Sequence, residues 1–365
     1  MEDKFLSFDN IELFINEYTD ADSPKAVVQI SHDINESADN YTEFAKKLND
    51  SGFLVYVLDQ RAHGKNTKND KAIGVYENDL FYDSVKDQVY LAHTLKAKHK
   101  LPLILVGHGF GRFVCERTSQ LTEHYDAVIV SGSNLFGSNI RMFTAKVITF
   151  LFNYFKNKND KAVFINTTIQ KYNQYKNVNW LCSSKEDKKE AKIYSNNYYY
   201  SYVSGLLDIY KTKNTIKMDN KKPIYIFAEE SDALNINKNE LKNIYEFYNE
   251  IGISVVERIY KLENKKEKEN LKKQVQNDLV NFINDVSDKK NIKSSKSGNS
   301  KINDPKNTNK DDSKSEDETK KTPTPVTKIY AEENKNEEDV KQQEKHITKI
   351  EKIKNKFKTK NKNKE

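Results

Sequence analysis

A glycine-rich turn that follows a short apolar run is the feature of this sequence that points most directly to chemistry. Residues 103–106 are apolar, residues 107–111 read Gly-His-Gly-Phe-Gly, and a helical pattern begins there. A strand, a tight turn and a helix in this order present a nucleophilic side chain at the centre of the turn. The central residue here is Gly109, which has no group that could attack a substrate. The sequence therefore predicts the turn of a nucleophile without the nucleophile itself.

After this turn, the chain has three residues whose side chains could replace the missing nucleophile. They are Cys115, Ser131 and Ser133. A buried cysteine behaves as a small apolar residue, and a serine at a strand end usually serves the structure. We therefore expect each of the three to be structural rather than catalytic.

The elements that would position this turn form a repeating pattern. Short β-rich apolar runs alternate with helical patterns through residues 1–285. This alternation is typical of an α/β domain with a mostly parallel sheet of about eight strands and helices on both faces, whose active site lies at the carboxyl ends of the strands. We expect a hairpin from residues 5–9 and 11–18, strands at 26–31, 53–59, 103–106, 127–130, 224–228 and 254–260, and helices at 41–49, 79–98, 237–251 and 270–285.

The strand and helix pattern is interrupted between residues 134 and 222. This segment is rich in Phe and Tyr and has a helical and irregular character. An insertion of this length between two strands of a parallel sheet is a candidate cap or lid over the site. A second packed subdomain without a gating role is an equally good interpretation.

The charge of the chain is concentrated at its end. The 365 residues include 61 Lys and Arg against 54 Asp and Glu, a net charge of +7, and residues 341–365 alone hold ten Lys against three Glu. A uniformly basic nucleic-acid-binding body is therefore excluded. Residues 286–340 have the composition of a disordered linker. In residues 341–365, Ile347, Ile350 and Phe357 recur at helical spacing, so a basic amphipathic helix that meets an anionic membrane surface or RNA competes with a solvated disordered tail.

Compartment and cofactors can be predicted from what the sequence does not contain. It has two cysteines, no phosphate-binding or dinucleotide-binding glycine motif, and no Cys-x-x-Cys or His-Glu-x-x-His motif. The start, Met-Glu-Asp-Lys, lacks the features of a signal peptide, and the longest apolar stretch, residues 142–155, falls short of the roughly 20 residues that span a membrane. We expect a soluble cytoplasmic protein without metal or organic cofactor, with peripheral membrane contact open through the tail.

Several motifs in the same order resemble the α/β-hydrolases of the monoacylglycerol lipase and lysophospholipase group, which are also described as serine aminopeptidase-like. The resemblance spans roughly residues 26–283 and places residues 107–111 at the nucleophile elbow. Residues 31–36, Ser-His-Asp-Ile-Asn-Glu, resemble the His-Gly-x-x-Glu oxyanion loop of these enzymes, with Asp33 in place of the glycine. The further matches are 61–64 (Arg-Ala-His-Gly), 179–181 (Asn-Trp-Leu), and 223–228 (Pro-Ile-Tyr-Ile-Phe-Ala) followed by Asp232.

The resemblance implies a catalytic triad of which two members are replaced. Gly109 stands at the nucleophile, Asp232 at the acid, and Lys265 at the position of the histidine base. Lys265 could act as a base only if burial lowered its pKa, and its polar, charged neighbours favour a solvated loop. No histidine occurs where the base is expected; the seven are His32, His63, His93, His99, His108, His124 and His346.

The resemblance also implies an oxyanion hole made by the backbone N–H groups of Ile34 and Phe110. Asp33 would bring a carboxylate next to the point where negative charge develops. His32 and His108 are expected to hold loops by hydrogen bonds, and they are candidate binding residues at the edge of the site.

Three functions remain open at this point. The first is a catalytically degenerate hydrolase whose pocket binds a lipid or another small apolar ligand. The second is an active lysophospholipase or esterase that uses a nucleophile foreign to the family. The third is an interaction protein tethered to a surface by its basic tail.

Overall fold

The computed structural model divides the chain into two units, Met1–Asn303 and Asp304–Glu365, and all residues that it describes belong to the first unit. The described residues are 2–34, 36–67, 73–131, 160, 181, 222–229, 245–246, 248–250, 252–262 and 267–298.

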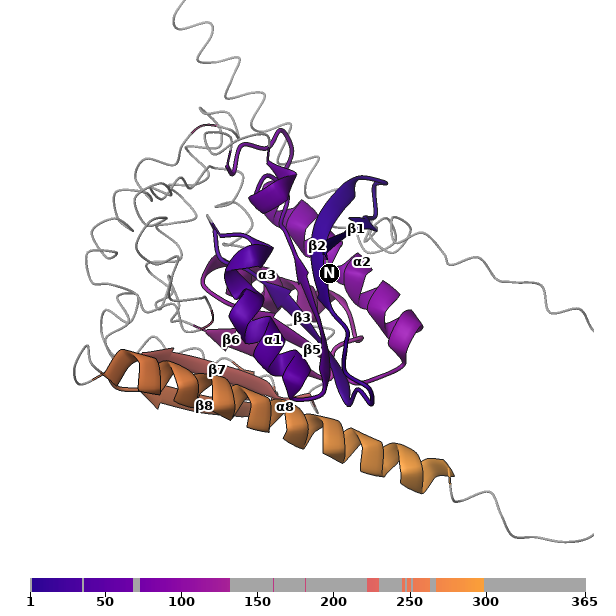
Figure 1. Cartoon of the computed structure of the whole chain (residues 1–365), viewed down its shortest axis with the longest axis vertical. Coiled ribbons are helices and arrows are strands. Elements are labelled where there is room, and N and C mark those ends of the chain that lie inside the picture. Colours follow the sequence, from indigo (N-terminus) through magenta and orange to yellow (C-terminus); the bar gives the residue numbers. More distant parts are fainter. Residues whose placement is uncertain are drawn as a thin grey trace, which may run out of the picture. The chain divides into compact units, whose positions relative to one another are not determined.

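A single sheet of eight strands organises the described residues (Figure 1). Its spatial order is β1-β2-β4-β3-β5-β6-β7-β8. The β1–β2 and β2–β4 pairs are antiparallel, and every other neighbouring pair is parallel. The strands are β1 (Glu2–Leu6), β2 (Glu12–Tyr18), β3 (Ala26–Ser31), β4 (Phe53–Leu58), β5 (Leu103–Gly107), β6 (Ala127–Ser131), β7 (Ile224–Glu229) and β8 (Val255–Tyr260).

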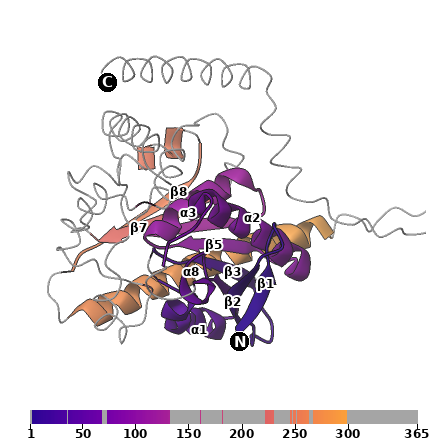
Figure 2. The ribbon, with the colours of Figure 1, turned by 90° about the horizontal axis from the view of Figure 1, so that it is seen from above.

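Helices cover both faces of this sheet. Figure 2 shows β3 and β5 between α1 on one side and α2 and α3 on the other. The long helix α8 shares a core cluster with α1. The helices are α1 (Thr42–Asp50), α2 (Leu80–His99), α3 (Phe110–Leu121) and α8 (Lys268–Gly298), and two short 3-10 helices are η1 (Ala38–Tyr41) and η2 (Gly64–Asn66).

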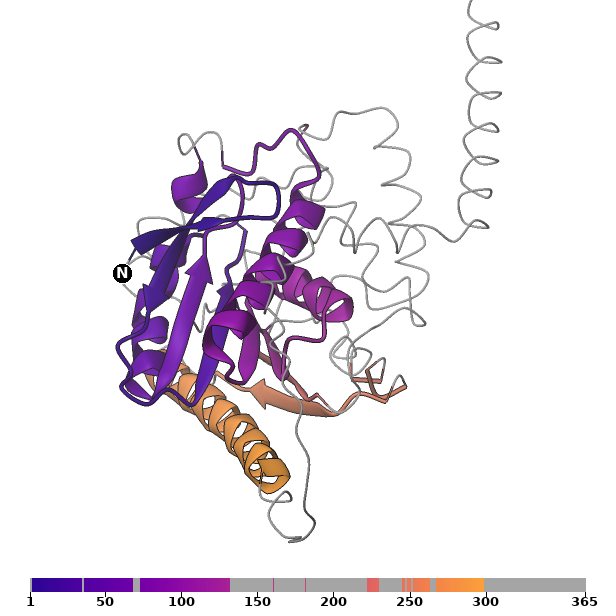
Figure 3. The ribbon, with the colours of Figure 1, turned by 90° about the vertical axis from the view of Figure 1, so that its right-hand side faces the viewer.

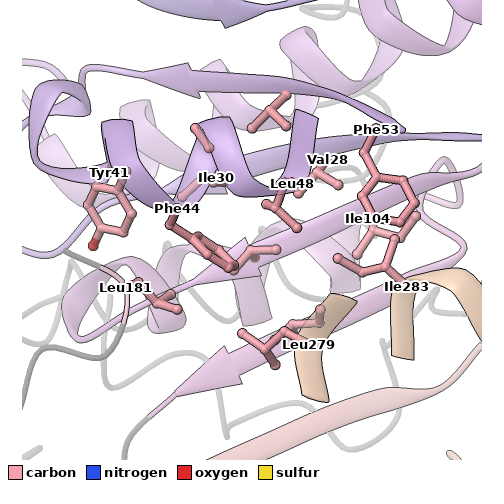
Figure 4. Packing of buried hydrophobic residues seen from close by; sticks show 14 of the residues in the cluster. Val28, Ile30, Tyr41, Phe44, Leu48, Phe53, Ile104, Leu181, Leu279 and Ile283 are labelled. Carbon is pink, nitrogen blue, oxygen red and sulfur yellow. The ribbon is translucent and has the colours of Figure 1, made fainter. Parts of the chain in front are cut away.

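The core explains why the central strands consist of apolar runs rather than alternating residues. Every residue of β3, β4, β5 and β6 is buried, because helices cover the strands from both sides. On one face, Phe44 and Leu48 of α1 pack with Leu279 and Ile283 of α8 (Figure 4). Burying such a side chain stabilises the fold by about 1.5–3 kcal/mol. Leu181, from the predicted 179–181 motif, is fully buried in the same cluster.

The predicted fold class is confirmed, and several element ends differ from the prediction. The first strand of the hairpin lies earlier in the chain than expected: β1 spans Glu2–Leu6 instead of residues 5–9. Ser7–Asn10 form the turn, in which Ser7 donates its N–H to the Ile11 carbonyl at 2.9 Å and Asn10 has φ 63°. Figure 3 shows this hairpin at the edge of the sheet away from β7 and β8.

The last helix is longer than predicted. The expected domain boundary near residue 286 falls inside α8, which continues to Gly298. Residues 286–297 contain no glycine or proline, so nothing in the backbone chemistry stops the helix before Gly298. Apart from residues 160, 181 and 222, the predicted cap at 134–222 lies outside the described residues, as do residues 299–365.

Candidate functional site

The predicted elbow connects β5 to α3. Gly109 precedes the first residue of α3 and has φ 54° and ψ −119°, a conformation that side chains disfavour. Gly107 and Gly111 allow close packing: a Cβ on Gly107 would lie 2.7 Å from the Arg112 Cα, and a Cβ on Gly111 would overlap the carbonyl oxygen of Ser31. The structure therefore keeps the sharp turn that would expose a nucleophile, although its central residue has none.

The two predicted oxyanion-hole donors do meet, and both are occupied. The backbone N–H of Ile34 donates to Asp33 Oδ1 at 2.7 Å, and the backbone N–H of Phe110 donates to the same oxygen. A Cβ built on Gly109 would overlap the carboxyl carbon and both carboxyl oxygens of Asp33. The Asp33 carboxyl group therefore lies at the predicted oxyanion hole and in the space that a side chain at position 109 would need.

The environment of Asp33 changes its acidity. Desolvation by burial raises the pKa of its carboxyl group to about 6, while the N–H donors of Phe110 and Ile34 partly offset that rise. Above this pH the group is a carboxylate. Its negative charge then lies at the N-terminus of α3, where the helix dipole favours an anion.

Neighbouring residues fix the position of Asp33. The Ile34 side chain is buried in a cluster with Phe81 of α2 and Phe110 of α3. In addition, the Asp33 N–H donates to Glu36 Oε2 at 3.1 Å, and the Tyr41 hydroxyl donates to the same oxygen at 2.6 Å. Glu36, which the sequence placed in the oxyanion-loop motif, therefore holds the loop.

His32 also holds the loop and is not available as a base. The ring is fully buried; its Nδ1–H donates to the Asp33 carbonyl at 2.7 Å, and its Nε2 accepts the Gln60 N–H at 2.9 Å. Burial lowers its pKa to about 4, so the ring is neutral at physiological pH. Both ring nitrogens are used, which supports the expected loop-holding role.

The turn after β4 is held in a similar way. His63 Nδ1 donates to the Arg61 carbonyl at 2.9 Å, and burial lowers the pKa of His63 to about 3. The Arg61 guanidinium makes paired hydrogen bonds of 2.6–2.8 Å to Asp9 and to Asp87, which tie this turn to the β1–β2 turn and to α2. Residues 61–64 of the predicted motif are thus fixed by buried hydrogen bonds.

One pairing at the site was not predicted from the sequence. His108 Nδ1 forms a short hydrogen bond with Ser131 Oγ, and desolvation lowers the His108 pKa to about 4. The strand register contains the signal, because Gly107 of β5 lies opposite Val130 of β6, so the residues that follow them are neighbours. A neutral histidine beside a serine hydroxyl is a possible base and nucleophile pair.

The other sequence candidates divide into two groups. Cys115 is fully buried, and burial raises the pKa of its thiol, so a reactive thiolate is disfavoured. Asp232, Lys265 and Ser133 lie outside the described residues, and the predicted convergence of Asp232 and Lys265 on Gly109 stays a prediction.

The described residues contain neither a metal-binding cluster nor a membrane-spanning helix. In that part of the chain, no group of three His, Cys, Asp or Glu side chains could hold a metal ion. No described helix is both long enough and apolar enough to cross a bilayer.

The sheet order, the helices on both faces and the elbow after β5 define an α/β-hydrolase. A carboxyl esterase from Bacillus coagulans in complex with glycerol aligns with a TM-score of 0.65 at 18% identity, covering 79% of this chain and 98% of that one. A monoglyceride lipase variant from Saccharomyces cerevisiae with a substrate analogue aligns with a TM-score of 0.54 at 15% identity, covering 78% and 94%. A family profile described as serine aminopeptidase, S33, matches residues 22–261, and the chain belongs to that family.

Two curated relatives are similar over shorter stretches. A monoacylglycerol lipase of Mycolicibacterium smegmatis is 26% identical over 132 residues, which are 36% of this chain and 46% of that protein. A monoglyceride lipase homolog of Monkeypox virus is 30% identical over 106 residues, 29% of this chain and 37% of that protein. The chain therefore matches less than half the length of these relatives.

Proposed function

We propose that this lipase- and esterase-like α/β-hydrolase is catalytically degenerate and does not transfer acyl groups. One observation carries the proposal: the Asp33 carboxyl group accepts hydrogen bonds from both oxyanion-hole donors, next to an elbow whose central residue is Gly109. The site has lost both the attacking group and the space for the developing oxyanion.

The energetic argument concerns the oxyanion. Acyl transfer places negative charge on the carbonyl oxygen, and losing one hole donor costs about 2.7–4 kcal/mol of transition-state stabilisation. Here the N–H groups of Ile34 and Phe110 already bind Asp33 Oδ1. An ionised Asp33 would also repel the oxyanion. A carboxylic ester bound here would therefore gain little stabilisation at the step where it needs it.

The retained scaffold supports a binding role for the site. The oxyanion loop and the turn after β4 are held by structural hydrogen bonds, although the elbow beside them carries no nucleophile. The curated relatives are named as monoacylglycerol and monoglyceride lipases. We therefore propose a lipid or another small apolar molecule as the ligand.

A second candidate function rests on the His108–Ser131 hydrogen bond. In this alternative, neutral His108 takes the proton of Ser131, and Ser131 attacks an ester. Two observations weigh against it: Ser131 is only 2% exposed, and the N–H groups of Ile34 and Phe110 are occupied by Asp33.

Labelling with a fluorophosphonate, together with a short-chain nitrophenyl ester assay, tests the proposal. We expect the wild-type protein to show neither covalent labelling nor ester hydrolysis above the buffer rate, while an active serine esterase in the same assay shows both. Labelling that disappears in Ser131→Ala would establish the second candidate. Labelling of any other serine with ester turnover would also contradict the degenerate assignment.

A further inference from the structure

We propose that Asp33 is itself a nucleophile, one that attacks saturated carbon rather than a carbonyl group. The substrates would be molecules in which a saturated carbon carries a good leaving group or belongs to a strained ring. A terminal epoxide is the simplest example. The inference goes beyond the loss of acyl transfer, although it uses the same placement of Asp33.

The first step concerns position. The Asp33 carboxyl group fills the volume that a side chain at position 109 would enter, since a Cβ on Gly109 would overlap its carboxyl carbon and both oxygens. This volume lies at the carboxyl ends of β3 and β5, the edge of a parallel sheet where reactive groups act. The oxyanion loop thus supplies from β3 a reactive group where the elbow supplies none.

The second step concerns orientation. Oδ1 is fixed by the N–H groups of Ile34 and Phe110, whereas no residue that the structure describes donates to Oδ2. Asp33 as a whole residue is only partly buried. A carboxylate held by one oxygen and open at the other is oriented for attack through Oδ2.

The third step decides the kind of electrophile. Attack on an ester carbonyl needs free donors for the developing oxyanion, and Asp33 Oδ1 already occupies both. Displacement at saturated carbon develops no charge on a carbonyl of the substrate. The two N–H groups can stay on Oδ1 throughout, because the ester that forms keeps that oxygen as its carbonyl.

The reaction with an epoxide balances without a further reagent except water. Oδ2 uses one lone pair to form a bond to the less substituted ring carbon. The bond between that carbon and the ring oxygen breaks, and its electron pair stays on the oxygen. This alkoxide takes a proton from water, which leaves a hydroxyalkyl ester of Asp33 and one hydroxide ion.

We expect the ester to persist, because the histidine next to Asp33 in the chain cannot act as the base that hydrolyses it. Both ring nitrogens of His32, the histidine next to Asp33, are used in hydrogen bonds. We therefore expect one stable adduct per protein rather than turnover.

The chain offers a matched control for this chemistry. The Asp59 carboxyl group also accepts two backbone N–H groups, those of Ala38 at 2.6 Å and Lys65 at 2.9 Å, and burial raises its pKa to about 6 as well. It differs in access, because the Asp59 side chain is only 3% exposed. Asp39, whose side chain is 54% exposed, represents an ordinary surface carboxylate.

The test is incubation of the full-length protein with decene oxide, followed by peptide mass spectrometry. We expect Asp33 to gain the whole mass of the epoxide about tenfold or more faster than Asp39, with Asp59 unlabelled. Asp33→Asn should lose this adduct and keep the slow surface labelling. Thermal unfolding of Asp33→Asn verifies folding, and the wild-type ratio of Asp33 to Asp39 labelling decides the question without that variant.

Labelling of Asp33 no faster than Asp39 would overturn the inference. That result would leave the degenerate assignment intact, because the fluorophosphonate and ester assays test acyl transfer separately. Ester turnover would contradict the degenerate assignment, but it would not contradict an epoxide adduct observed on Asp33.

Discussion

The side chain of Asp33 occupies two neighbouring positions of the candidate site. It accepts hydrogen bonds from both donors of the predicted oxyanion hole, and it takes the space that a side chain at position 109 would need. Restoring a serine at position 109 is the repair that the sequence suggests. The structure shows that this repair alone puts the serine into the Asp33 carboxyl group.

We predict that Gly109→Ser destabilises the protein by about 1–3 kcal/mol, because of the positive φ and the overlap with Asp33. Asp33→Gly in the same chain should recover part of that loss, since it removes the overlapping carboxyl group. Denaturant unfolding of the two single variants and the double variant measures the coupling free energy between them, expected to be about 1 kcal/mol or more.

Gly52→Ser is the matched control for this cycle. Gly52 also has a positive φ, 90°, but a Cβ there would meet only the Lys25 Cε, at 3.9 Å. The effect of Gly52→Ser on the free energy of unfolding should therefore be additive with the effect of Asp33→Gly. Equal coupling in both pairs would show that backbone strain, and not the Asp33 overlap, dominates at position 109.

Among the elements, β3, β5 and α3 meet so closely that one methyl group has no room. A Cβ on Gly111 would overlap the carbonyl oxygens of Ser31 and His32, which are backbone atoms and cannot rotate away. We predict that Gly111→Ala lowers the free energy of unfolding by about 1–3 kcal/mol or more. Urea denaturation measures this free energy. The control is Glu123→Ala, at an exposed position after α3, whose stability we expect to stay within about 0.5 kcal/mol of wild type. A Gly111→Ala variant as stable as the control would mean that this contact is looser than the structure shows.

Much of the fold could be predicted from the sequence, because buried parallel strands appear as unbroken apolar runs. Residues 26–31 and 103–106 are examples, and their carboxyl ends do form the site. Helix and hairpin ends were less predictable. β1 already ends at Leu6, before a turn in which Asn10 is left-handed, and α8 continues through polar residues that tolerate a helix.

The occupation of the oxyanion hole could not be predicted from residue types alone. The sequence placed Asp33 beside Ile34 and Phe110, but whether the carboxyl group turned toward or away from the N–H groups depended on packing. The burial of Ile34 and the hydrogen bond between His32 and the Asp33 carbonyl, which fix the backbone on either side of that carboxyl group, are tertiary contacts. The His108–Ser131 bond depends similarly on the register of β5 and β6.

For the whole molecule, the net charge of +7 belongs to residues 341–365, which lie outside the described part of the chain. We propose that this segment binds anionic membrane surfaces, since each basic residue near such a surface contributes about 1 kcal/mol. A full-length variant with its ten lysines in this segment replaced by glutamine should lose binding to anionic vesicles.

Co-sedimentation with anionic and neutral vesicles measures this binding, with RNA as a competitor. Binding should weaken as salt rises, because the Debye length is roughly 8 Å at physiological ionic strength and shorter above it. Equal binding by the wild type and the glutamine variant would remove the tail from membrane attachment. Preference for RNA over vesicles would assign the tail to nucleic acid instead.

The occupied oxyanion hole is tested most directly by the amide proton shifts of Ile34 and Phe110, followed by NMR between about pH 4 and pH 8. Because both N–H groups donate to Asp33 Oδ1, ionisation of Asp33 should strengthen both hydrogen bonds and move both signals downfield. The two signals should share one midpoint near the Asp33 pKa of about 6, and the transition should vanish in Asp33→Asn. The account would be contradicted if the amide shifts of Ile34 and Phe110 did not change with pH, or if they titrated in Asp33→Asn as in the wild type. Either result would show that Asp33 does not accept hydrogen bonds from these two N–H groups.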